Sequence, residues 1–158
     1  MTQLNRLIDR LCDADIDFVI VGGFAGMLHG STLVTRDLDI CAVLTLENVA
    51  KLREVLRDLN PTHRQTPQRL SFLDNPSADV QVRNLYLETT LGPVDILSSI
   101  KGVGDYARVR ETSAEIQLFG RRCRVISVED LILAKESLAR PKDLLAAEEL
   151  RAILHQKK

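Results

Sequence analysis

The sequence predicts an α+β (mixed α/β) fold: a mixed sheet with helices mainly on one face, in a single domain covering residues 1–158. Stretches with apolar residues at helical spacing alternate along the chain with short β-branched runs. The 158 residues are 45% hydrophobic and 27% charged, values that are typical of one folded domain. The order of the elements does not by itself fix how the strands pair.

The first half of the chain alternates between helical and extended patterns. Apolar side chains at helical spacing predict helices over residues 3–14, 24–29 and 46–59. β-branched or alternating runs predict strands over residues 18–21 and 37–43. The Gly22-Gly23 pair ends the first strand sharply, and Pro61 closes the third helix.

The second half predicts strands first and helices last. Residues 62–76 are polar and rich in turn formers, which indicates a loop with one short strand. Further strands are expected over residues 80–87, 94–97, 114–119 and 122–126, the last two forming a hairpin. Two C-terminal helices are expected over residues 128–154: Ser127 with Asp130 predicts a capping box for the first, and Pro141 suits the first turn of the second.

Composition and charge exclude several classes of protein. Twenty-one Lys and Arg residues against 22 Asp and Glu leave a formal charge of −1, so no overall charge favours nucleic acid or an anionic membrane. The longest uncharged stretch, residues 18–35, is interrupted by glycines and hydroxyl side chains, so no membrane span is expected. Three widely spaced cysteines form neither a zinc nor a disulfide pattern, and no signal peptide is evident. We therefore expect a cytoplasmic protein.

Two aspartates of the second predicted strand carry the most chemical information. Asp37 and Asp39 are two residues apart, so on a strand they share one face, with Cα atoms roughly 6.6–6.8 Å apart. Two unpaired carboxylates this close raise each other's pKa unless a cation lies between them, and Mg²⁺ prefers such oxygen ligands. The alternative interpretation of the pair is a solvated strand face.

Two glycines and a third acid strengthen the chemical interpretation. Gly22-Gly23 permits close backbone approach, and the helix that follows presents free N–H groups to an anion. Asp95 lies between two apolar residues of another predicted strand. If that strand pairs beside the one that carries Asp37 and Asp39, three carboxylates converge and can hold two metal ions for phosphoryl transfer. A tight turn for the glycines and an ordinary polar face for Asp95 are the alternatives.

Several of these segments resemble the signature of the polymerase β-like nucleotidyltransferase superfamily, in particular its small stand-alone bacterial and archaeal members. They are residues 21–25 (VGGFA), 29–30 (HG) and 35–40 (TRDLDI). Residues 91–97, 130–135 and 140–144 are similar to segments of that family too, so the resemblance covers residues 17–150. It implies Mg²⁺-dependent transfer of a nucleoside monophosphate from an NTP such as ATP to a hydroxyl, with release of pyrophosphate.

The resemblance also implies roles for individual residues. Gly22 and Gly23 would cradle the triphosphate of the nucleotide. Asp37 and Asp39 would bind Mg²⁺, and Asp95 would complete a two-metal site and act as a base. All three aspartates are therefore expected to be catalytic.

Three further positions bear on nucleotide binding. Lys135 lies beside apolar residues of a predicted helix and can reach a phosphate; the alternative is a surface lysine. Many relatives have Ser at the position of Gly23 and a basic residue at the position of Leu33, so part of the triphosphate contact is absent here. The alternative function is therefore a catalytically weak or inactive nucleotide-binding, antitoxin-like regulatory protein. A glycosyltransferase, which also uses a D-x-D pair, leaves the glycine turn unexplained.

The acceptor and the partners stay open at this point. A small molecule, a tRNA end or a protein hydroxyl could each receive the nucleotide. A homodimer or a helical partner protein would complete an acceptor cleft, and no membrane association is expected. Arg121, Arg122 and Arg124 form a basic cluster, either a solvated hairpin tip or a contact for RNA or a partner.

Overall fold

A seven-stranded mixed sheet organises the computed structural model, which describes residues 3–156. Its strands run in the order β3 (Thr62–His63), β4 (Asn84–Thr89), β5 (Gly92–Leu97), β2 (Leu38–Cys41), β1 (Val19–Val21), β9 (Arg121–Val125) and β8 (Ala114–Leu118). The α-helices are α1 (Leu4–Asp13), α2 (Gly22–Leu28), α3 (Leu46–Leu56), α4 (Tyr106–Glu111), α5 (Val128–Leu138) and α6 (Pro141–Gln156). A 3₁₀ turn, Arg57–Leu59, extends α3, and β6 (Ser99–Ile100) pairs with β7 (Gly104–Asp105). The expected mixed α/β class is confirmed.

The central strand β2 connects the two halves of the sheet. It pairs antiparallel with β1 and parallel with β5. This register places Ile40 between Ile20 and Ile96, and all three side chains are fully buried. Because side chains alternate along a strand, the residue before Ile40 points to the opposite face of the sheet.

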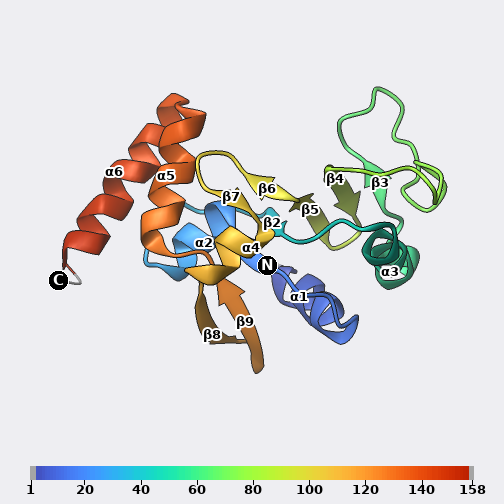
Figure 1. Ribbon diagram of the computed structural model, residues 1–158, viewed down its shortest axis with the longest axis horizontal. Coiled ribbons are helices and arrows are strands. Elements are labelled where there is room, and N and C mark those ends of the chain that lie inside the picture. Colours follow the sequence, from blue (N-terminus) through green and yellow to red (C-terminus); the bar gives the residue numbers. More distant parts are fainter. Residues whose placement is uncertain (1–2, 157–158) are drawn as a thin grey trace.

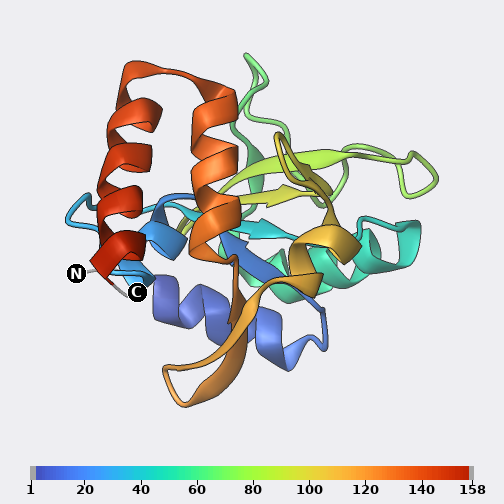
Figure 2. The ribbon, with the colours of Figure 1, turned by 60° about the vertical axis from the view of Figure 1, so that its left-hand side comes forward.

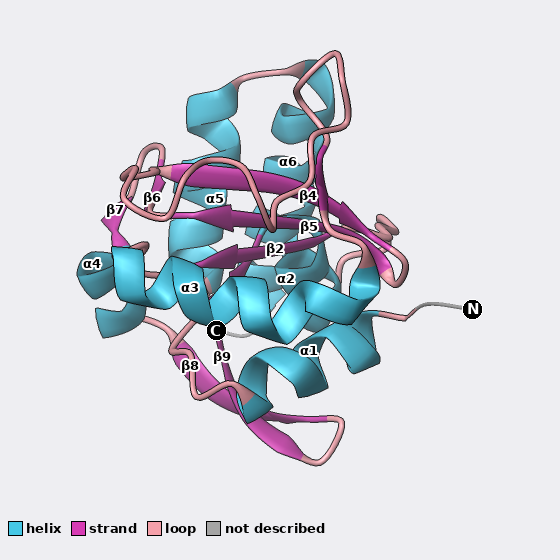
Figure 3. Ribbon diagram, turned by 90° about the vertical axis from the view of Figure 1, so that its right-hand side faces the viewer, coloured by secondary structure: helices cyan, strands magenta, loops and turns pink. Residues whose placement is uncertain are grey.

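The helices lie on two sides of this sheet, whereas the sequence predicted them mainly on one face. In Figure 3, α1 and α3 lie in front of the central strands, and α5 and α6 lie behind them. Figure 2 shows α5 and α6 side by side as an antiparallel pair, joined at one end by a short connection. Figure 1 shows this pair at one end of the molecule and the long loops around β3 at the other. No helix within residues 3–156 has both the length and the apolar character needed to cross a bilayer.

Most predicted elements are present, and several boundaries differ. The α2 helix begins at Gly22 rather than at residue 24, so the glycines form its first turn. The β2 strand begins at Leu38, which leaves Asp37 outside it. The β4 strand begins at Asn84 rather than at residue 80; residues 80–83 are irregular and mostly exposed. Residues 98–113, for which no pattern was evident, contain β6, β7 and α4.

Polar contacts fix the start of α5 and the position of the β8–β9 hairpin. The Ser127 hydroxyl accepts the amide of Asp130 at 3.1 Å and caps α5, as expected. The Asp130 carboxylate accepts the Arg108 guanidinium at 2.9 and 3.0 Å rather than the Ser127 amide, so the capping box is only half formed. Arg121 pairs with Asp9 at 3.0 Å and with Asp13 at 2.6 Å, which holds the hairpin against α1. One arginine of the basic cluster is therefore a structural contact.

The row of isoleucines supports β2, the strand that carries Asp39. Ile40→Ala removes a fully buried side chain from the middle of this row. We expect it to lower the free energy of unfolding by about 2–5 kcal/mol, and Ile40→Val by about 0.5–1.5 kcal/mol. Urea unfolding followed by circular dichroism measures both. A loss under 1 kcal/mol for the alanine variant would contradict the buried β1–β2–β5 register.

A candidate active site between the central strands and the last two helices

Three aspartates predicted from the sequence line one cavity of about 460 Å³. Asp39 of β2 lies directly opposite Asp95 of β5, because the two strands are parallel and in register at this pair. Asp37 lies just before β2, is exposed, and lines the same cavity. The strand pairing on which the convergence of the acids depended is therefore present. Asp37 does not share the strand with Asp39, contrary to expectation.

Gly22 leaves the space that the Asp39 carboxylate occupies. Its φ is +69°, a conformation that L side chains rarely adopt. A Cβ atom at this position would overlap the Asp39 Oδ2 atom. A glycine is therefore required here by the neighbouring carboxylate as well as by the backbone.

Gly23 makes room for Thr35 in a similar way. A Cβ atom on Gly23 would lie 3.0 Å from Thr35 Cγ2 and 3.5 Å from its hydroxyl oxygen. That hydroxyl also accepts the amide of Asp37 at 3.2 Å. The side of the cavity where residue 23 lacks a hydroxyl thus carries one from Thr35, to which the resemblance assigned no individual role.

Asp39 is the least favourable charge in the site. Burial raises its pKa to about 6, and the negative charges of Asp95 and Asp37 contribute to the same rise. Its Oδ1 atom is buried and has no hydrogen-bond partner. A buried carboxylate without a partner is destabilising, and a cation placed beside it would relieve that cost.

Cationic side chains from the α5–α6 junction line the other part of the cavity. Lys135 of α5 is among them, together with Arg140 and Lys142. Asp143 is almost fully buried between the first two: it lies 3.8 Å from Lys135 Nζ and accepts Arg140 Nε at 2.5 Å. Burial alone would raise the pKa of Asp143, but the hydrogen bond and charge of Arg140, with the charge of Lys135, hold it below the usual value.

Asp143 is buried although its sequence neighbour Lys142 is charged and exposed. It is turned inward because α6 packs along α5. It holds Lys135 and Arg140 at the cavity, and Lys135 is mostly buried rather than a solvated surface lysine. Glu149 of α6 binds the loop that follows α2: its carboxylate accepts the amide of Thr32 at 3.2 Å and the hydroxyls of Ser31 and Thr32. No local pattern indicated either acid.

The donor set fits Mg²⁺, although not as the preformed three-acid site that was expected. Within residues 3–156 no three His, Cys, Asp or Glu side chains lie close enough to hold a metal ion. Mg²⁺ usually uses one or two carboxylates and completes its shell with water and substrate phosphates. Asp39 and Asp95 meet that requirement, because they are neighbours in register and the buried Oδ1 atom of Asp39 accepts no hydrogen bond.

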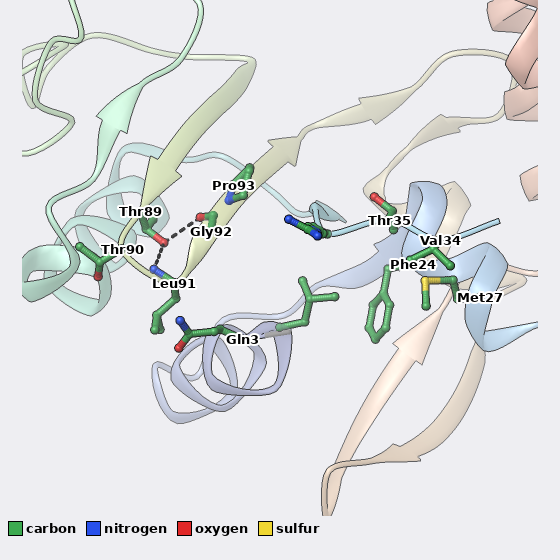
Figure 4. A pocket seen from close by; sticks show the side chains of 12 residues that line it. Gln3, Phe24, Met27, Val34, Thr35, Thr89, Thr90, Leu91, Gly92 and Pro93 are labelled. Carbon is green, nitrogen blue, oxygen red and sulfur yellow. Dashed lines mark hydrogen bonds between the residues drawn. The ribbon is translucent and has the colours of Figure 1, made fainter. Parts of the chain in front are cut away.

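A second cavity of about 600 Å³ adjoins the first, with which it shares Val34 and Thr35. Figure 4 shows it between the β4–β5 turn on one side and α2 with residues 34–35 on the other. Apolar side chains such as Phe24, Met27 and Leu91 line it, and no acidic residue does. A hydrogen bond from the Leu91 amide to the Thr89 hydroxyl, at 3.1 Å, fixes the turn.

No protein-family model matches the chain, and no curated protein matches it significantly. Solved structures do. The lincosamide antibiotic adenylyltransferase LnuA, in its lincomycin-bound form, is 16% identical, with a TM-score of 0.64 over 96% of each chain. The antibiotic-resistance factor ANT(2'')-Ia is 16% identical, with a TM-score of 0.63 over 99% of this chain and 83% of its own. A Thermotoga maritima protein provisionally assigned as a nucleotidyltransferase is 16% identical, with a TM-score of 0.53 over 97% of this chain and 91% of its own. At this identity the similarity concerns the fold.

The raised pKa of Asp39 has a measurable effect on stability. Between about pH 4 and 6 the folded protein retains a proton that the unfolded chain has lost, so the free energy of unfolding falls as the pH rises through this window. Asp39→Asn removes the effect and should raise the free energy of unfolding at pH 7.5 by about 1–3 kcal/mol in EDTA, measured by urea titration. Asp79→Asn, at an exposed position, should change nothing. A less stable Asp39→Asn protein would contradict this account of the site.

Gly22→Ala tests whether the glycine makes room for Asp39. Gly120→Ala is its matched control, because Gly120 has a similar φ of +79° but no atom within 4 Å of an added Cβ. Both variants should lose about 1 kcal/mol or more from backbone strain. Only Gly22→Ala should lose further stability and weaken Mn²⁺-nucleotide binding in calorimetry. Equal effects of the two substitutions would show that the contact with Asp39 is unimportant.

Proposed function

We propose that this chain, which has the fold of the polymerase β-like nucleotidyltransferases, transfers a nucleoside monophosphate from an NTP to a hydroxyl acceptor with the help of Mg²⁺. One observation carries the proposal. The adjacent carboxylates of Asp39 and Asp95 and the cations Lys135 and Arg140 line the same cavity. A metal-bound triphosphate has the charges needed to lie between them, since its phosphates pair with the cations and its metal with the acids.

Each group has a defined role in this reaction. Asp39 and Asp95, with Asp37 at the cavity wall, would hold Mg²⁺, which supplies Lewis acidity at the α-phosphate. Lys135 and Arg140 would pair with the phosphates that leave as pyrophosphate.

Asp95 is the proposed proton acceptor. The O–H bond of the acceptor breaks as its oxygen bonds to the α-phosphorus, and the proton passes to an Asp95 oxygen. The bond from the α-phosphorus to the bridging oxygen breaks, and pyrophosphate leaves with that electron pair.

The glycine turn contributes less than the family resemblance implied. Gly22 and Gly23 would let the triphosphate approach the backbone, but residue 23 has no hydroxyl to offer it. We place the Thr35 hydroxyl in that role, because it lies 3.5 Å from where a Cβ of residue 23 would be. Leu33, at the position where a basic residue is common, is half exposed at the cavity and supplies no charge.

The apolar cavity of Figure 4 is our candidate for the acceptor site. Pro93 lines this cavity, and Asp95 lines the cavity that holds the three aspartates. The two residues are two positions apart on β5, so their side chains lie on the same face of the strand. An acceptor there would reach the acids from the adjoining cavity, which Lys135 does not line. The neighbours LnuA and ANT(2'')-Ia are antibiotic-modifying or antibiotic-resistance proteins, which supports a small-molecule acceptor here.

Nucleotide binding without turnover is the second candidate function. It is favoured by the lack of three clustered metal-binding side chains within residues 3–156. Calorimetry with Mg²⁺-ATP, followed by pyrophosphate measurement with a panel of hydroxyl compounds, distinguishes the two. Binding together with acceptor-dependent pyrophosphate release supports the transferase. Binding without any release supports the regulatory alternative.

The double variant Asp37→Asn/Asp39→Asn tests the metal role. It should reduce pyrophosphate release by roughly 10²-fold or more, because charge stabilisation of the transferring phosphoryl group is lost. Its fold should be retained, since the substitutions relieve repulsion, and circular dichroism checks this. Unchanged release would refute the role of these acids in catalysis.

A further inference from the structure

Arg64 reaches the acid pair from a distant part of the chain. It follows β3 directly, in the segment expected to be a polar loop. Its Nη1 atom lies 2.6 Å from Asp95 Oδ1, and both side chains are mostly buried, 23% and 17% exposed. Arg64 belongs to none of the motifs that drew attention in the sequence, yet it is the cation in closest contact with the third acid.

The guanidinium is held in place by the neighbouring strand β4. The Arg64 amide donates to the carbonyl of Tyr86 at 2.8 Å, and Nη1 donates to the carbonyl of Leu87 at 2.9 Å. Tyr86 is the residue of β4 that pairs with Asp95. The strand that flanks Asp95 therefore also positions its counter-charge.

The contact puts Arg64 where a cation bound to Asp95 would lie. Nη1 is in direct contact with Asp95 Oδ1, and that oxygen is buried. Arg64 therefore neutralises the carboxylate by charge and steadies its orientation. A cation that used this oxygen would have to share it with the guanidinium or displace it.

We propose that Arg64 is the positioning residue of the site: it fixes the Asp95 carboxylate beside Asp39 and competes with divalent cations for it, so that the metal binds well only together with nucleotide phosphates. The part concerning turnover rests on the proposed function, and the part concerning cation binding does not. In the nucleotide-free protein, Arg64 offsets one of the clustered negative charges. When the triphosphate adds its own negative charge, the balance moves in favour of the metal.

A purely structural role makes a different prediction. If Arg64 served only to bond the β4 carbonyl, its removal would loosen Asp95 and weaken every ligand alike. If it competes with the cation, its removal strengthens cation binding to the nucleotide-free protein while it harms turnover. The two effects have opposite signs, so one titration separates the two roles.

The test is a calorimetric titration of MnCl₂ into the nucleotide-free protein. Arg64→Gln should bind Mn²⁺ about tenfold more tightly than the wild type, because a positive charge next to Asp95 has been removed. Arg64→Lys keeps the charge and should bind Mn²⁺ close to the wild-type affinity. Arg57→Gln, which removes the same charge from an exposed pair with Glu54, should leave the affinity unchanged.

Turnover supplies the second measurement. Pyrophosphate release by Arg64→Gln should fall about tenfold or more, while release by Arg57→Gln should equal that of the wild type. Mn²⁺ binding to Arg64→Gln that is as weak as, or weaker than, wild-type binding would overturn the proposal. If Arg64→Gln fails to fold by circular dichroism, Arg64→Lys decides: affinity near wild type supports competition by charge, and a large loss overturns it. Tighter Mn²⁺ binding in a protein that releases no pyrophosphate would refute the proposed function and leave the competition intact.

Discussion

The site depends on one constraint: the Oδ1 atom of the Asp39 carboxylate is buried beside Asp95 and has no hydrogen-bond partner. Asp39 is placed there by the register of β2 against β5, and the isoleucine row on the other face of the sheet keeps that register. Burial and neighbouring charge both disfavour the ionised form. Ionised Asp39 therefore lowers the stability of the ligand-free protein, a pattern that is common at binding and catalytic sites.

The surrounding residues can be understood as responses to that carboxylate. Gly22 leaves space for it, Arg64 balances the adjacent Asp95, and the α5–α6 junction presents cations to the same cavity. Asp143 is the counterpart of Asp39 among these, because it is a buried acid with its partners supplied: Arg140 and Lys135 keep its pKa low, whereas Asp39 has no such partner. The charge of Asp143 is therefore compensated by its neighbours, whereas the charge of Asp39 is left for the proposed metal to compensate.

Local patterns predicted most of the helices and the residue types of the site but not its long-range contacts. Asp39 could be identified from its position beside apolar neighbours, yet its pairing with Asp95 depends on the parallel β2–β5 contact, which the order of strands leaves open. Arg64 lies in a polar segment and reaches the site only through the β3–β4 pairing. Asp143 looked like a surface residue because its burial is produced by the packing of α6 on α5. The α4 helix was missed since its six residues give too short a period to recognise.

The most direct test of the central claim is to follow the carboxyl carbon of Asp39 by NMR while the pH is varied, in EDTA and then with Mg²⁺ and a non-hydrolysable nucleotide. The account predicts a pKa of about 6 without metal and a clearly lower value when metal and nucleotide are bound, because the cation stabilises the ionised form. A pKa near that of an exposed aspartate in both conditions would contradict the account. It would show that neither burial nor a bound cation changes the pKa of this carboxylate.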